Sequence, residues 1–415
     1  MPLDFAAFRA TSRFASLDGV RGVAAVAVVL FHFGGPSFAW ASGWLGVHVF
    51  FVLSGFLITT LALREEERRG RISLRNFYVR RIFRIWPAYF AVLAVLVAVF
   101  VLRDEYAARQ IGPALPWYVS FNVDLWPVDN ILFGQTWTIG IEQKFYLVWP
   151  LLAFVPWLPG LRRHRLALMA AVFGVAAALW SVTGGYVVHY LVIAVGCLVA
   201  VLLHDRRTFG YAAALARPAP AALCWATFVA YHLAVPTLVR VVGGEPLVIL
   251  GYGFVVGLIM PSLVALPVLS RLFGGRFLTW WGERSYSLYL VQGLAGWVLA
   301  TVLPVFGNLR LLSGIAVVLA SAVMADVFHR WVELPGIQLG RRFTSVASGS
   351  TRHGAAAGLH HAVPVAGGPV PVPGATGVPA DGRATPRTGI LEDQPIPSPR
   401  ADREESVHGA PAPAG

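Results

Sequence analysis

The chain has 415 residues, of which 57% are hydrophobic and only 13% are charged. Soluble globular proteins carry about 25% charged residues, so this composition excludes an ordinary soluble domain and predicts a polytopic membrane protein. The formal net charge of +12 comes with arginines clustered in short loops between apolar runs. That pattern is typical of cytoplasmic loops and excludes a nucleic-acid-binding protein, which would need a basic-aromatic module.

Ten apolar runs have about the 20 residues that a membrane-spanning helix needs. They lie near residues 19–37, 44–63, 86–102, 137–157, 166–183, 187–203, 221–239, 247–268, 285–304 and 311–329. We therefore expect an all-α protein, a transmembrane bundle of about ten helices. Its first run is expected to be an uncleaved helix rather than a signal peptide, because Arg21 would interrupt the apolar core of such a peptide.

Arginine-rich loops alternate with arginine-poor loops along this map. The rich segments are 64–84, 162–165, 206–207, 271–276 and 341–342, and all of them fall on the same side as the N-terminus. The opposite loops hold only Arg103, Arg109, Arg240 and Arg310. Because positively charged loops stay in the cytoplasm, we expect a multi-pass protein of the cell membrane with both termini cytoplasmic.

The composition changes near residue 346 to alanine, proline and glycine with mixed charges. Such a segment cannot bury enough apolar surface to fold alone. The sequence therefore predicts a membrane domain over residues 14–342 and a disordered cytoplasmic tail over residues 346–415 without a catalytic role.

Two ionisable residues interrupt the first apolar run, "SLDGVRGVAAVAVVLFHFG". Arg21 and His32 are eleven positions apart, which on an ideal helix puts them within roughly 20° of one face and about 16 Å apart along the axis. With a cytoplasmic N-terminus, Arg21 lies in the inner leaflet and His32 in the outer half. Ionisable residues at such depths usually face a functional cavity. The alternatives are an arginine that reaches the inner interface and a histidine hydrogen-bonded between helices.

Three of the four arginines in "RNFYVRRIFRIWPAYF" stand just before the third run, at the cytoplasmic start of the expected helix. Arg81 and Arg84 share a helix face, and Arg80 stands four residues before Arg84. A cluster of cytoplasmic loop charges is the alternative, but these three continue into the apolar span. Because a guanidinium group binds phosphate oxygens in pairs, the pattern favours a phosphorylated cytoplasmic ligand.

The fourth run carries Glu142 and Lys144, the only lysine of the chain, in "QTWTIGIEQKFYLVWPLL". The alternative to a functional role is an interfacial ion pair beneath an aromatic belt. On the predicted topology, Glu142 lies at the same depth as His32. The segments "GERSYSLYLVQ" and "HRWVELPG" carry polar residues that suit packing or helix ends.

In combination, these segments resemble the acyltransferase-3 family of integral membrane O-acyltransferases. The similar stretches are "LDGVRGVAAVAVVLFH", "GWLGVHVFFVLSGFLI", "YVRRIFRIWPAYF", "TWTIGIEQKFYLVWP", "ERSYSLYLVQ" and "VELP", in the family's order. Three positions depart from the family pattern. His48 stands where Asp is common, Gln292 stands where His is frequent, and Gly140 is a mild change in the fourth run.

The resemblance implies an enzyme that moves an acyl group, with acetyl expected, from cytoplasmic acyl-CoA to a hydroxyl group of a surface carbohydrate or a secreted small molecule. It implies that His32 is catalytic. A neutral imidazole would remove the hydroxyl proton or would accept the acyl group first, and the sequence leaves both routes open. Glu142 is expected to orient the imidazole or the acceptor, and Arg21 completes the expected catalytic group.

Arg81 and Arg84, with Arg80, are expected to bind the phosphates of acyl-CoA. Acyl-CoA is a donor substrate, so no cofactor is expected, and the ligand spacing suggests no metal. The expected partners are acyl-CoA, the hydroxylated acceptor and membrane lipids. A proton-coupled transporter of a small metabolite is the alternative, with His32 and Glu142 as its proton relay.

Overall fold

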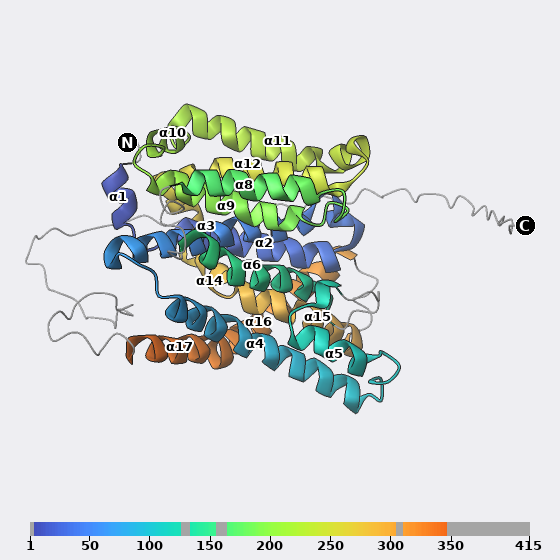
Figure 1. The fold of residues 1–415 in the computed structure, drawn as a ribbon. Helices are drawn as coiled ribbons and strands as arrows, with labels where there is room; N and C mark the ends of the chain where they lie inside the picture. Colours follow the sequence, from blue (N-terminus) through green and yellow to red (C-terminus); the bar gives the residue numbers. More distant parts are fainter. Residues whose placement is uncertain (1–3, 126–132, 155–163, 304–309, 347–415) are drawn as a thin grey trace, which may run out of the picture. The chain divides into compact units, whose positions relative to one another are not determined.

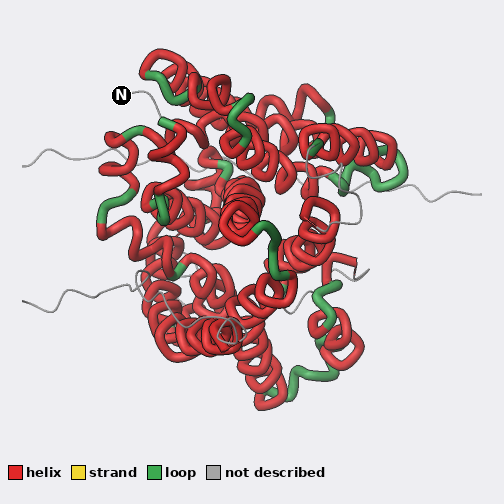
Figure 2. The backbone as a smooth tube through the Cα atoms, turned by 60° about the vertical axis from the view of Figure 1, so that its left-hand side comes forward, coloured by secondary structure: helices red, strands yellow, loops and turns green. Residues whose placement is uncertain are grey.

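The computed structural model describes residues 4–125, 133–154, 164–303 and 310–346. Within these ranges the chain is all helix and connecting loop, as expected (Figure 2). The predicted tail over 346–415 lies, apart from its first residue, outside the described residues.

Each of the ten expected apolar runs overlaps one long helix, labelled in Figure 1 where space allows. These helices are α2 (Ala15–Phe33), α3 (Gly46–Arg69), α4 (Leu74–Leu102), α6 (Trp137–Phe154), α8 (Arg165–Leu179), α9 (Val188–His204), α11 (Pro218–Val242), α12 (Glu245–Ala265), α15 (Ser285–Val302) and α16 (Arg310–Phe328).

Shorter elements connect them. They are α1 (Phe5–Ala10), α5 (Ile111–Val119), α10 (Phe209–Ala214), α13 (Pro267–Phe273), α14 (Arg276–Glu283), α17 (Leu334–Val346), four 3₁₀ turns (Gly35–Ala41, Gly43–Leu45, Val123–Leu125 and Gly134–Thr136) and a π-helical turn (His329–Glu333).

In the described part of the chain, six helices are long and apolar enough to cross a membrane. They cover Ala15–Phe33, Gly43–Arg69, Leu74–Leu102, Pro218–Val242, Glu245–Ala265 and Leu312–Thr344. Helices α8 and α9 are apolar but shorter. The chain thus has the helices of a multi-pass membrane protein, and a full set of ten crossings with cytoplasmic termini stays a prediction.

Helices α3 and α9 pack with their backbones in contact at two glycines. A Cβ atom on Gly55 would stand 2.0 Å from the carbonyl oxygen of Ile193, and one on Gly196 would stand 2.0 Å from that of Val52. No larger residue fits at either position without moving a helix, because real Cβ contacts of that length do not occur. The glycines therefore fix how closely the two helices approach.

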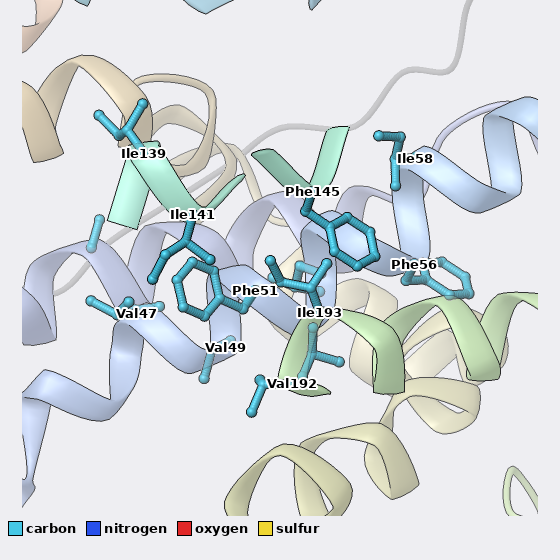
Figure 3. Close-up of a cluster of buried hydrophobic side chains, with 14 of the residues drawn as sticks. Val47, Val49, Phe51, Phe56, Ile58, Ile139, Ile141, Phe145, Val192 and Ile193 are labelled. Carbon is cyan, nitrogen blue, oxygen red and sulfur yellow. The ribbon is translucent and has the colours of Figure 1, made fainter. Parts of the chain in front are cut away.

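A buried apolar cluster surrounds this contact (Figure 3). Phe51 and Phe56 of α3 lie beside Val192 and Ile193 of α9, and α6 adds Ile139, Ile141 and Phe145. The cluster fixes α6 against the α3–α9 pair. This matters for the site, because α6 carries Glu142.

Candidate functional site

Three arginines and a glutamate from three separate helices come together in the bundle. Arg21 of α2 lies within electrostatic range of Arg84 of α4 and of Glu142 of α6. Arg81, one helical turn before Arg84, lies within range of the same glutamate. All four side chains are partly buried. The structure thus groups four of the six residues that the sequence singles out, and we call Arg21, Arg81, Arg84 and Glu142 the arginine cluster.

Two hydroxyl groups complete the surroundings of Glu142. Its carboxyl group interacts with the hydroxyl groups of Ser54 on α3 and of Tyr146, one turn later on α6. Those two hydroxyl groups are also hydrogen-bonded to one another. The guanidinium carbon of Arg81 lies 5.3 Å from the centre of the Tyr146 ring, a favourable cation–π arrangement. Tyr146 therefore joins the arginine to the carboxylate.

The carboxylates near Arg21 are already engaged by other groups. Asp18 forms an ion pair with Arg13, with a nitrogen–oxygen distance of 2.8 Å. Glu333 accepts a hydrogen bond of 2.7 Å from Ser287. Across the described residues, no carboxylate forms a direct ion pair with the guanidinium groups of the arginine cluster. The cluster therefore carries an excess of positive charge at a partly buried position, which is costly unless an anion binds there.

Arg80 takes a different position from the arginine cluster. Its guanidinium group lies 2.8 Å from Glu65, and its side chain is 42% exposed. Glu65 also accepts a hydrogen bond of 3.0 Å from the backbone nitrogen of Ser73, the residue that caps α4. Arg80 thus contacts the α3–α4 connection, whereas Arg81 and Arg84 point into the bundle's polar interior.

His32 lies on the last turn of α2 and is exposed. Its Nδ1 atom is 2.9 Å from the carbonyl oxygen of Val28, and its ring contacts those of Phe31 and Phe33. Donation from Nδ1 to that carbonyl fixes the tautomer in which Nε2 carries the lone pair. Glu142, in contrast, interacts with the arginines and the two hydroxyl groups, so the structure does not place it beside the imidazole.

Lys144 belongs to an ion pair with a residue that the sequence analysis missed. Its Nζ atom lies 2.6 Å and 2.7 Å from the two carboxylate oxygens of Asp124, whose side chain is 1% exposed. Tyr186 donates a third hydrogen bond, of 3.0 Å, to the same carboxylate. Gly140 permits this approach, because a Cβ atom there would stand 2.8 Å from Asp124. Lys144 thus forms an ion pair, whereas Glu142 forms none among the described residues.

Residues 14–329 match a family model described as an acyltransferase domain. The chain belongs to the acyltransferase-3 family. Peptidoglycan O-acetyltransferase OatA of Listeria monocytogenes is 28% identical over 368 residues, which cover 77% of this chain and 55% of the relative. The putative peptidoglycan O-acetyltransferase YrhL of Bacillus subtilis is 25% identical over 358 residues, 77% of this chain and 54% of the relative.

The O-acetyltransferase OatA of Staphylococcus aureus is 26% identical over 352 residues, which cover 77% of this chain and 56% of the relative. The chain thus spans about half the length of the curated relatives it matches. No solved structure matches it.

A second polar network, missed from the sequence, lies next to the arginine cluster of this acyltransferase-3 chain. Oε2 of Glu333 is 2.7 Å from the Ser287 hydroxyl oxygen and 2.9 Å from Nδ1 of His329, and Glu333 is 1% exposed. His329 and Glu333 stand on the π-helical turn, a feature that often occurs at functional sites. Glu333 lies within electrostatic range of Arg21, so it extends the polar region toward α15 and α16. The sequence feature that could have indicated this network is the pair of ionisable residues one turn apart in "HRWVELPG".

Two of the three departures from the acyltransferase-3 pattern, His48 and Gln292, lie outside the arginine cluster. His48 is 2% exposed, and its Nε2 atom lies 3.4 Å from Nδ1 of His189 on α9. The aromatic rings of Trp44 and Phe51 pack around it. Gln292 donates a hydrogen bond of 3.1 Å to the carbonyl oxygen of Tyr289 within α15. Both residues therefore have structural partners of their own.

Proposed function

We propose that the chain is a membrane-embedded O-acyltransferase that moves an acyl group from cytoplasmic acyl-CoA to a hydroxyl group of a surface carbohydrate or a secreted small molecule. The observation that carries the proposal is the excess positive charge of the arginine cluster in a chain of the acyltransferase-3 family. The names of the relatives, which include peptidoglycan O-acetyltransferases, favour a carbohydrate acceptor.

The arginine cluster would hold the anionic part of the donor. Guanidinium groups form paired, charge-assisted hydrogen bonds with phosphate oxygens, and Arg81 and Arg84 stand one turn apart on α4. The phosphates of acyl-CoA would offset the cost of keeping these charges out of water. Glu142 acts through its neighbours, because its carboxyl group lies within range of both Arg21 and Arg81 and keeps them near one another.

The acyl transfer itself is assigned to His32. Its Nε2 atom takes the proton of the acceptor hydroxyl group while the hydroxyl oxygen attacks the thioester carbonyl carbon. A carbon–oxygen bond forms, the carbon–sulfur bond breaks, and the leaving thiolate of CoA takes the proton from the imidazolium. In the neutral ring, donation from Nδ1 to the Val28 carbonyl oxygen leaves the lone pair on Nε2. Prior transfer of the acyl group to the imidazole is the other route open to the same residue.

The arginine positions also favour one orientation of the chain. The donor is cytoplasmic, and Arg21 and Arg81 lie in the first halves of α2 and α4, which start on the same side of the predicted topology. His32 lies at the opposite end of α2. We therefore propose that both termini are cytoplasmic and that the acceptor approaches from the exterior. The tail over 346–415 is proposed to be dispensable for this reaction.

Purified full-length chain in lipid nanodiscs tests the proposed function. We expect release of CoA from acetyl-CoA and transfer of the acetyl group to a soluble muropeptide or an oligosaccharide, both lost in His32→Ala. The transporter alternative predicts no thioester cleavage, and uptake of a metabolite driven by a proton gradient. If no acyl-CoA is cleaved and no acceptor is acylated by folded protein, the proposed function is wrong.

A further inference from the structure

A small cavity lies between α4 and α15, about three helical turns beyond Arg84 along α4. Its volume is about 150 Å³, and most of its wall is apolar, with Phe100 and Trp297 among the lining residues. Gln135 supplies the one polar side chain, and Gly293 of α15 leaves the wall open at one point. An apolar wall with a single orienting polar group is the usual construction of a small-molecule site.

One face of α15 leads from the arginine cluster to this cavity. Tyr286, Tyr289, Gly293 and Gly296 follow one another at spacings of three, four and three residues, so they share a helix face. Tyr286 lies within electrostatic range of Arg84, and Tyr289 lies within range of Glu142. Gly293 is one turn farther along and lines the cavity.

The same face continues toward the end of α2 that carries His32. A Cβ atom on Gly296 would stand 2.3 Å from the ring of Phe33, so this ring rests on the α15 backbone. Phe33 directly follows His32 in the chain. The cavity therefore lies along α15 beyond the arginine cluster and at the level of the α2 end. A donor held by its phosphates at the arginine cluster would extend its acyl group in this direction.

The volume indicates the size of the group that fits. An apolar protein cavity of about 150 Å³ accommodates a molecule the size of benzene, which has six carbon atoms. An acetyl group would leave most of such a cavity empty, whereas chains of about four to six carbons would fill it. Each methylene group buried there is expected to improve binding by about fourfold.

We propose that this cavity binds the alkyl part of the donor acyl group, and that the chain accepts acyl groups of up to about six carbons in preference to acetyl. This inference rests on the proposed function. Gln135 marks the polar end of the cavity. Its side-chain nitrogen donates to the carbonyl oxygen of Leu290 at 3.2 Å, which fixes the amide with its oxygen available to a polar group of the donor. Gly293 limits the length of acyl chain that fits, because the absence of a side chain at this position provides part of the cavity's volume.

Gly293 offers a direct test. A Cβ atom there would meet only the Gln135 amide, at 3.6 Å and 3.8 Å, so a side chain can be added without displacing the backbone. The experiment measures kcat/KM of the full-length chain in nanodiscs with acyl-CoA donors of two, four, six, eight and ten carbons. For the wild type, we expect kcat/KM to rise from two to six carbons and to fall beyond.

Gly293→Leu should lower kcat/KM for the six-carbon donor at least tenfold more than it lowers kcat/KM for acetyl-CoA. Phe100→Ala enlarges the cavity and should move the optimum toward eight or ten carbons, which keeps the test valid if one variant is unstable. Gly174→Leu on α8 is the matched control, because a Cβ atom on Gly174 has no neighbour within 4 Å and the residue is exposed. It should leave the length profile unchanged.

The outcomes separate this inference from the proposed function. If acetyl-CoA is used but longer donors are no better, the cavity proposal is overturned and the acyltransferase activity stands. A length profile that neither Gly293→Leu nor Phe100→Ala alters also overturns it, and assigns the cavity to a membrane lipid chain or to packing. If no donor of any length is cleaved, the proposed function itself fails.

Discussion

The guanidinium group of Arg81 lies over the aromatic ring of Tyr146, with 5.3 Å between the guanidinium carbon and the centre of the ring. This contact joins α4 to α6 at the point where Tyr146 also meets the carboxyl group of Glu142. The ring can hold the guanidinium group without neutralising its charge. Arg81 is thus positioned and still able to bind an anion, which an ion pair with a carboxylate would prevent.

The donor-binding role of the arginine cluster predicts an effect on KM. Arg81→Gln or Arg84→Gln removes charge-assisted hydrogen bonds to phosphate, each worth about 1.5–3 kcal/mol. We expect the KM for acyl-CoA to rise at least tenfold in each variant. Arg80→Gln is the matched control and should have a smaller effect, because Glu65 engages its guanidinium group. Equal effects of all three substitutions would show that the cluster does not act as a specific phosphate site.

The catalytic role of His32 predicts the opposite kinetic pattern. His32→Ala should lower single-turnover acyl transfer about 100-fold or more, the usual contribution of a general base, while donor affinity stays within about twofold. His164→Ala is the control, since His164 is an exposed histidine before α8. Transfer by His32→Ala at a rate close to wild type would exclude the imidazole from the chemistry.

The ion pair between Lys144 and Asp124 predicts a loss of stability rather than a change in chemistry. Lys144→Met leaves the buried carboxylate of Asp124 without its countercharge, and breaking such a pair costs about 3–5 kcal/mol. We expect a clear drop in the Tm of the detergent-solubilised protein, partly restored in Lys144→Met/Asp124→Asn. Arg103→Gln, in an exposed ion pair with Glu105, should change Tm little. A similar Tm for both single variants would argue against a structural role of the buried pair.

The topology can be tested with single cysteines and a membrane-impermeant thiol reagent, in a background with Ser at 197 and 224. Cysteines at positions 70, 206 and 274 should react only after the cells are opened, whereas a cysteine at position 120 should react in intact cells. The reason is the asymmetry of arginine between the two sets of loops. Reaction of two or more of the first set in intact cells would reverse the proposed orientation.

The tail proposal predicts that truncation after Ser345 leaves acyl transfer within a few-fold of the full-length chain. The alanine-, proline- and glycine-rich composition gives this segment little apolar surface to contribute to a folded site. The measurement is single-turnover transfer, with insertion into the membrane checked by fluorescence of a fused reporter. Complete loss of transfer in an inserted variant would give the tail a role in the reaction.

The helices were predictable because each one depends on the hydropathy of its own stretch of sequence. Length and hydropathy identify each apolar run, and every expected run overlaps a helix. Arg21, Arg81, Arg84 and Glu142 could be proposed as a site because ionisable residues inside apolar runs are costly and need a reason to be there. Their grouping in one cluster agrees with that reasoning, although their catalytic and binding roles stay predictions.

The partners of these residues were not predictable, because they depend on tertiary contacts. Asp124 lies in a connecting segment, and only the close approach at Gly140 brings it to Lys144. Glu333 reaches the cluster through a π-helical turn, which shifts the register of the helix end. The equal depth of Glu142 and His32 came from the predicted topology alone, and the sequence carried no signal that Glu142 lies within electrostatic range of Arg21, eleven positions before His32.

The glycine contacts between α3 and α9 have a mechanical consequence. With Gly55 and Gly196 holding the two backbones against each other, this pair can neither slide nor separate without breaking packing on both sides. The α3–α9 pair is therefore the rigid part of the bundle. Any motion that lets a long pantetheine arm enter and leave has to take place on the other side of the bundle, where α4 and α15 border the small cavity. Spin labels on α4 and α15 would therefore report the turnover cycle, while labels on α3 and α9 would stay at a fixed separation throughout.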